Sequence, residues 1–72
     1  MLIKRSFTLA GHRTSVALEP EFWDALGRMA TGLGTTLSRL VAEVDTQRGP
    51  GHPLASALRV RALLAGRPGT GA

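Results

Sequence analysis

Cysteine is absent from this 72-residue chain, and acidic residues are few. Without cysteine the chain has neither a disulfide nor a cysteine-based zinc site, and the absence is typical of a reducing compartment. The two histidines, His12 and His52, are far apart in the sequence and belong to no Ser/His/Asp arrangement. We therefore expect no metal site, no cofactor and no enzymatic activity.

Long apolar runs are absent too. No segment approaches the roughly 18 apolar residues of a membrane span. No apolar stretch follows Leu2 and Ile3, as it would in a signal peptide. A chain of this length forms one domain with a small core, for which oligomerisation is a usual source of stability. These absences favour a cytoplasmic protein that associates with itself.

The shortage of acidic residues leaves a net charge of +4, from nine basic residues and five acidic ones. Every basic residue except Lys4 is an arginine, and arginine forms paired hydrogen bonds with phosphate or guanine. Nucleic acid is therefore the leading class of partner. A basic surface that only contacts water is the alternative.

Two N-terminal segments alternate between apolar and polar residues, as strands do, but with opposite parity. Large apolar residues occupy odd positions in the first and even positions in the second: Ile3, Phe7 and Leu9, then Val16 and Leu18. This change requires a turn or bulge, which Gly11 would permit at residues 10–12. We expect an arm or weak strand within residues 1–12 and a firmer strand at 13–18.

Two helices are expected next. Pro20 suits the first position of one helix, its apolar stripe continues to Leu33, and Gly34 suits the left-handed residue that ends it. Thr36 is the predicted N-cap of the second helix, which runs to about Gln47. An outward pair of Arg39 and Glu43 is expected on it at i,i+4 spacing.

The C-terminal third of the chain is predicted as a Gly/Pro linker at 49–53, a third helix at 54–65 and a disordered tail at 66–72. The third helix is apolar nearly all round, so its own domain and a neighbour should both cover it. Arg61 projects from within its apolar arc. Arg59 and Arg61 either contact an acidic partner or have no specific role.

A single firm strand followed by two helices leaves the backbone N–H and C=O groups of the strand unpaired. The same strand of a second copy can form hydrogen bonds with them. We expect a two-fold dimer in which residues 13–18 of both chains form an antiparallel ribbon. Val16 and Leu18 would face the core. Arg13, Ser15 and Ala17 would face away, which gives a two-stranded ribbon with six outward side chains, a size that enters a DNA major groove.

The segments "RTSVAL", "EPEFWDALGRMA" and "GTTLSRLVAEV" resemble the ribbon-helix-helix DNA-binding family, which includes the Met and Arc repressors, over about residues 12–48. With "KRSFTLAGHRTSVALEPEFWDAL" and "LASALRV", residues 4–60 resemble a bacterial subfamily of small ribbon-helix-helix domain proteins. The resemblance implies a mainly α fold with one β-strand, an intertwined homodimer with an intermolecular ribbon, a core at 13–48 and a third C-terminal helix.

The resemblance also implies site residues. Base edges would be contacted by Arg13, Ser15 and Ala17, although Ala17 departs from the polar residue expected there. Phosphates would be contacted by the start of the second helix and by the arm: Thr35, Thr36, Leu37 and Ser38, with Lys4 and Arg5. The shared dimer core would comprise Val16, Leu18, Phe22, Trp23, Leu26, Met29, Leu40, Val41 and Val44.

These features favour a sequence-specific DNA-binding protein that represses transcription by occupying its sites in the nucleoid. Two alternatives stay open. One is an antitoxin-type autoregulator whose residues 49–72 bind a toxin. The other is a dimeric protein-interaction adaptor that has lost DNA binding, which the small side chain of Ala17 would fit. The third helix could also join dimers on adjacent DNA sites.

Overall fold

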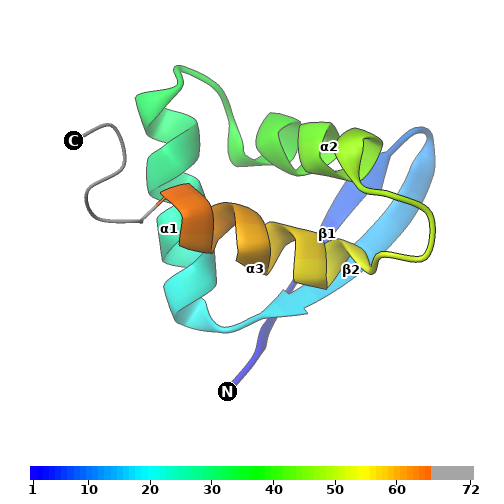
Figure 1. Cartoon of the computed structure of the whole chain (residues 1–72), viewed down its shortest axis with the longest axis horizontal. Coiled ribbons are helices and arrows are strands. Elements are labelled where there is room, and N and C mark those ends of the chain that lie inside the picture. The colour runs from blue at the N-terminus through cyan, green and yellow to red at the C-terminus, as the bar shows by residue number, and fades with distance from the viewer. Residues whose placement is uncertain (66–72) are drawn as a thin grey trace.

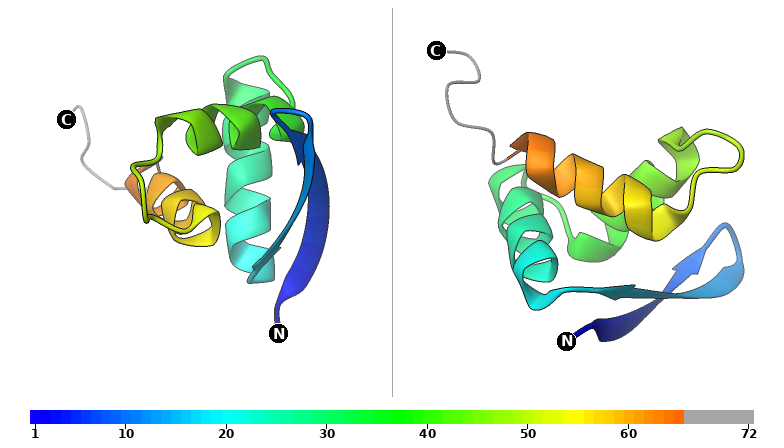
Figure 2. Two further views of the ribbon diagram at one scale, coloured as in Figure 1. Left: turned by 90° about the vertical axis from the view of Figure 1, so that its right-hand side faces the viewer. Right: turned by 60° about the horizontal axis from the view of Figure 1, so that its bottom comes forward.

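A β-hairpin and three helices make up the fold in the computed structural model, which describes residues 1–65. The elements are β1 (Ile3–Leu9), β2 (His12–Leu18), α1 (Pro20–Gly32), α2 (Leu37–Gln47) and α3 (Leu54–Ala65) (Figure 1). The hairpin lies on one side of the molecule and α3 on the other, and β2 also contacts α3 directly (Figure 2). The predicted disordered tail at 66–72 falls outside the described residues.

The strand at the start of the chain is the main correction to the predicted fold. Residues 3–9 form a full strand that pairs antiparallel with β2 of the same chain, so the described chain has two strands where we predicted one firm strand. Leu9 pairs with His12 across a two-residue loop. Ala10 and Gly11 both have positive φ, 51° and 81°, as a type I′ turn requires. This turn explains why the apolar residues occupy odd positions in β1 and even positions in β2. The intertwined dimer stays a prediction.

The ends of α1 follow the predicted signals. Pro20 is its first residue, and the amides of Phe22 and Trp23 donate to the Glu19 carbonyl. At the other end, Gly34 has a φ of +70°, which confirms its expected left-handed conformation. The amide of Thr35 donates back to Ala30 at 2.9 Å, so the helix closes with a Schellman motif.

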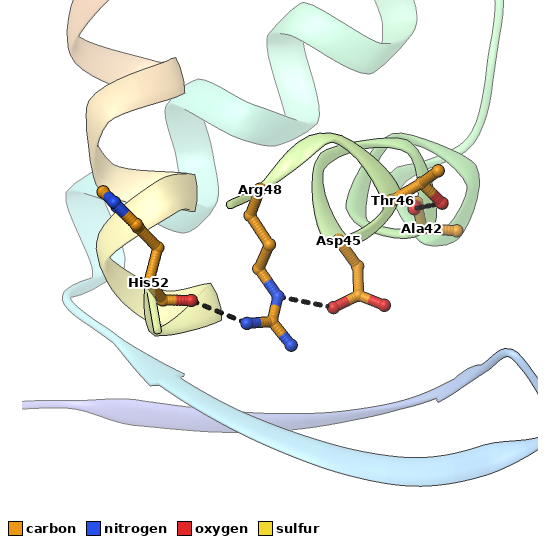
Figure 3. A network of polar contacts seen from close by, with 5 residues as sticks. All are labelled: Ala42, Asp45, Thr46, Arg48 and His52. Atoms are coloured by element: carbon orange, nitrogen blue, oxygen red, sulfur yellow. Dashed lines mark hydrogen bonds and ion pairs between the residues drawn. The ribbon is translucent and has the colours of Figure 1, made fainter. Parts of the chain in front are cut away.

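The next connections are fixed by side chains. The hydroxyl of Thr36 accepts from the Arg39 amide at 3.1 Å and confirms Thr36 as the N-cap of α2. After α2, Arg48 donates from Nε to Asp45 Oδ1 at 2.7 Å and from NH1 to the His52 carbonyl at 2.6 Å (Figure 3). Arg48 thereby holds the linker against the end of α2.

The core closes within one chain. Its buried residues come from all five elements: Phe7, Leu9, Val16, Leu18, Trp23, Leu26, Ala30, Leu40, Val41, Val44, Leu54, Leu58 and Ala62. Of the predicted dimer core, Phe22 and Met29 are only partly buried, and the other seven residues belong to this set. Sharing of this core with a second chain remains a prediction. None of the helices in residues 1–65 is both long and apolar enough to span a bilayer.

Two arginines fasten α3 to the rest of the domain. Arg59 donates from Nε to Glu19 Oε1 at 3.0 Å, and its guanidinium lies 5.9 Å from the centre of the Phe22 ring. Arg61 donates to Glu43 Oε1 at 3.0 Å and to Gln47 Oε1 at 3.2 Å, both on α2. Both charges are therefore engaged inside the chain, which argues against their use on an acidic partner.

Candidate nucleic-acid interface

The outward face of the hairpin consists of three cross-strand pairs. The register pairs Lys4 with Ala17, Ser6 with Ser15, and Thr8 with Arg13. Because the alternate residues of both strands pack on the core, these six side chains point away from it. The predicted outward set of Arg13, Ser15 and Ala17 thus lies on one face, with Ala17 half-buried and the other two exposed.

The β1 half of this face was missed by the sequence analysis. Ser6 Oγ and Ser15 Oγ lie 3.1 Å apart in a hydrogen bond, and Arg13 NH1 donates to Thr8 Oγ1 at 3.5 Å. The odd apolar positions of residues 3–9 could have revealed the outward even positions, had the segment been accepted as a strand. The face has no acidic side chain, and its hydroxyls can both donate and accept hydrogen bonds.

Lys4 and Arg5, predicted together as phosphate contacts, lie on opposite faces of β1. Lys4 lies beside Ala17 on the outward face. Arg5 points to the helix side, where its guanidinium is 5.5 Å from the centre of the Trp23 ring. Arg5 and Leu37 line the same surface hollow, so the start of α2 lies beside β1. The start of α2 therefore lies next to Arg5, on the helix side of the hairpin.

The start of α2 offers fewer free amides than predicted. The amide of Thr35 already donates to Ala30, so the prediction that it is free for a phosphate is wrong. The Thr36 hydroxyl caps the helix. The amides of Thr36, Leu37 and Ser38 donate to no acceptor within residues 1–65. These three amides, at the positive end of the helix dipole, are the ones suited to an anion.

Charge is distributed unevenly over the molecule. Four arginines of the described chain form ion pairs with carboxylates: Arg28 with Asp24, Arg48 with Asp45, Arg59 with Glu19, and Arg61 with Glu43. The other four cations within residues 1–65 form no such pair, and all lie on the hairpin or in the first turn of α2: Lys4, Arg5, Arg13 and Arg39. The uncompensated positive charge thus gathers on the surface that includes the predicted DNA contacts.

Arg39 is a candidate contact that the sequence analysis missed. Its spacing from Glu43 predicted an ion pair between them, but Glu43 contacts Arg61 instead. Arg39 is left exposed beside the free amides of α2. A contact formed between residues eighteen positions apart displaced one expected between neighbouring turns.

Comparison with family models gives a match over most of the chain. A family model described as "Ribbon-helix-helix domain" matches residues 2–65, which include both strands and all three helices. Searches of curated proteins and of solved structures found no match.

Proposed function

The chain belongs to the ribbon-helix-helix family, whose members generally bind DNA and form dimers. From this premise we propose that it binds double-stranded DNA with the outward hairpin face in the major groove and regulates transcription by occupying its sites. The observation that carries this proposal is the clustering of the unpaired cations on the hairpin and the start of α2. Such a regulator acts at the nucleoid, in the cytoplasm.

The free edge of β2 supports a homodimer. Because the two-residue loop makes Leu9 and His12 a hydrogen-bonded pair, the backbone groups of Arg13, Ser15 and Ala17 point away from β1. Those groups can pair with the same edge of a second copy. A two-fold axis centred on Ser15 places Arg13 beside the partner's Ala17, so the small side chain of Ala17 leaves room for the arginine.

The width of the groove decides which strands enter it. Neighbouring strands lie about 4.8 Å apart, so the outer strands of a four-stranded sheet are about 14 Å apart. The major groove is about 12 Å wide and admits a two-stranded ribbon. The two central β2 strands therefore enter the groove, and the β1 strands meet its walls.

This arrangement assigns roles to the candidate residues. Arg13 and Ser15 contact base edges, and Ala17 can contact a thymine methyl group. Phosphates at the groove walls are contacted from β1 and from the start of α2: Lys4, Arg5, Thr36, Leu37, Ser38 and Arg39. This keeps the predicted division between base and phosphate contacts, with Arg39 added and the amide of Thr35 removed. Neither the antitoxin nor the adaptor alternative has a comparable observation in its favour.

The test measures binding of the purified protein to its own upstream region and to random DNA across a salt series. Arg13→Ala should reduce the preference for the specific site by about 1–3 kcal/mol per lost guanine contact. Lys4→Ala should leave that preference unchanged and lower the salt slope by about 0.9 for each lost phosphate contact. Arg28→Ala, which removes a paired arginine on α1, is the control. Equal wild-type affinity for both DNAs would contradict a specific regulator.

The dimer is tested separately by sedimentation. Ser15→Pro removes one N–H from the free edge of β2, and Ser6→Pro removes one from the free edge of β1. Only Ser15→Pro should convert the dimer to a monomer. Loss of the dimer with Ser6→Pro alone would place the two-fold axis at β1 instead.

A further inference from the structure

The outward side of α3 is an apolar surface. Val60, Leu63 and Leu64 are 51%, 69% and 49% exposed, and Ser56 and Ala57 complete the same side of the helix. On a helix with 100° per residue, these five residues form one continuous arc that contains no charged side chain. Arg59 and Arg61 fall at its two borders. The low polarity all round α3 predicted a helix covered on two sides. Within residues 1–65 only the side formed by Leu54, Leu58 and Ala62 is buried.

The charges beside this surface are already compensated. Arg59 pairs with Glu19, and Arg61 pairs with Glu43. Two copies of the surface can therefore meet without bringing unpaired like charges together, although the whole chain has a net charge of +4. With these two arginines paired, the surface has little electrostatic attraction for DNA.

This surface adjoins a hollow. Between α2 and α3 lies a hollow of about 380 Å³ with a mixed apolar and polar lining: Val44, Gln47, Arg48, His52, Ser56, Ala57, Val60, Arg61 and Leu64. Leu63, the most exposed large apolar residue of α3, is not one of the lining residues and belongs to the adjoining part of the same helix side. A two-fold contact in which Leu63 of each copy covers the hollow of the other would be reciprocal, as an isologous interface requires.

This surface and the hairpin face point in opposite directions. The buried side of α3 and the inward face of the hairpin pack on the same core from opposite sides (Figure 2). The outward side of α3 therefore points away from the outward face of β1 and β2. A contact through α3 leaves the hairpin of each copy free.

We propose that α3 joins copies of this chain back to back, so that their hairpins hold two separate DNA segments; the DNA part of this inference rests on the proposed function. Two magnitudes favour a second copy as the occupant. The two Arg13 guanine contacts of one dimer discriminate about 25- to 20,000-fold, which covers only the lower part of the roughly 10³- to 10⁷-fold preference of specific sites, so a link between dimers extends the preference. Once one of two linked dimers is bound, the other dimer is held at a high effective concentration near its own DNA site, which raises the preference for paired sites.

The size of the contact predicts its strength. A helix of 12 residues is about 18 Å long, so one face of α3 buries well under the roughly 800 Å² per partner of a stable interface. The back-to-back contact is therefore weak in solution. It forms at high protein concentration, or where two DNA segments bring dimers together.

The test compares Leu63→Glu with Leu33→Glu, a matched control on the loop after α1 that is 64% exposed. Sedimentation over a protein concentration series measures self-association without DNA. A capture experiment, in which an immobilised duplex retains a labelled second duplex, measures bridging. Wild type and Leu33→Glu should show species larger than a dimer and should bridge. Leu63→Glu should return the mass to that of the dimer and abolish bridging, with unchanged affinity for a single duplex.

Three results overturn the inference: no wild-type species above the dimer at any concentration, no effect of Leu63→Glu on mass, or an equal effect of Leu33→Glu. A failure of DNA binding is distinguishable. In that case no protein retains the labelled duplex, but the mass difference between the two variants persists and supports the α3 contact on its own.

Discussion

The indole nitrogen of Trp23 donates a 2.7 Å hydrogen bond to the carbonyl oxygen of Ile3 and so ties the first residue of β1 to the first turn of α1. The same indole lies below the Arg5 guanidinium and 5.9 Å from the Phe7 ring, measured between ring centres. Three residues of β1, namely Ile3, Arg5 and Phe7, thus contact the side chain of Trp23. The strand that completes the candidate DNA surface is held in place by α1 as well as by β2.

Replacing Trp23 with phenylalanine should loosen β1. Trp23→Phe keeps an aromatic ring but leaves the Ile3 carbonyl without its indole donor, which should cost about 1–2 kcal/mol of unfolding free energy. Amide hydrogen exchange in residues 3–9 should accelerate more than in α2. Arg5→Ala removes only the cation over the ring and should cost about 0.5–1 kcal/mol. Unchanged exchange in β1 would rule out the anchoring role of the indole.

The hairpin turn contains strain that a substitution can relieve. Ala10 has a φ of 51°, in the left-handed region that an alanine adopts at a cost of about 1–2 kcal/mol. Ala10→Asn creates the Asn-Gly pair favoured in type I′ turns and should raise the unfolding free energy by about 0.5–1 kcal/mol. Ala10→Val, with its branched side chain, should lower it. Chemical denaturation of the two variants measures both changes, and a stabilised valine variant would contradict the turn assignment.

Two glycines should respond to alanine with opposite signs. Gly27 lies inside α1 with open space around its α-carbon, so Gly27→Ala should stabilise the protein by about 0.5–1 kcal/mol. Gly34 has a φ of +70°, so Gly34→Ala should destabilise it by about 1–2 kcal/mol. The melting temperatures of the Gly27→Ala and Gly34→Ala variants test the Schellman motif at the end of α1. Equal effects at both positions would mean that Gly34 does not need its left-handed conformation.

The contact between Glu19 and Arg59 should make stability depend on pH. Hydrogen bonding of the Glu19 carboxylate to its own backbone amide, and then to Arg59, lowers the pKa of Glu19. A lowered folded-state pKa adds stability above the unfolded-state pKa, and this stability is lost as the pH falls through the folded value. Glu19→Gln should therefore lower the melting temperature at neutral pH and have little effect in strong acid. Glu21→Gln, in the same turn, controls for the loss of negative charge near the helix end, and a matching effect there would exclude a special role for Arg59.

The sequence was sufficient for features set by a few neighbouring residues. Pro20, Gly34 and Thr36 mark helix ends through backbone geometry or a local hydrogen bond, and all three lie where predicted. The alternation in residues 13–18 likewise predicted which side chains face outward, because a strand has a period of two.

Features decided by competition between distant residues were not predicted. Pairing of β1 with β2 depends on Ala10 adopting positive φ, which its residue type disfavours, and packing on Trp23 helps to offset that cost. Arg39 was expected to pair with Glu43, but α3 brings Arg61 to the same carboxylate. The parity change at residues 10–12 did indicate a turn, but the strength of the β1 pairing depends on Trp23 of α1, and the partner of Glu43 depends on where α3 packs.

The uneven charge also affects how the protein approaches a ligand. Uncompensated cations at the hairpin end and neutralised arginines at the α3 end give the described domain an electric dipole along that axis. Near a polyanion, such a dipole experiences a torque that turns the hairpin forward before any contact forms, so a larger fraction of collisions is productive. Salt shortens the range of this torque, to about 10 Å at 0.1 M. Association should therefore slow with rising salt even where the final contacts are unchanged.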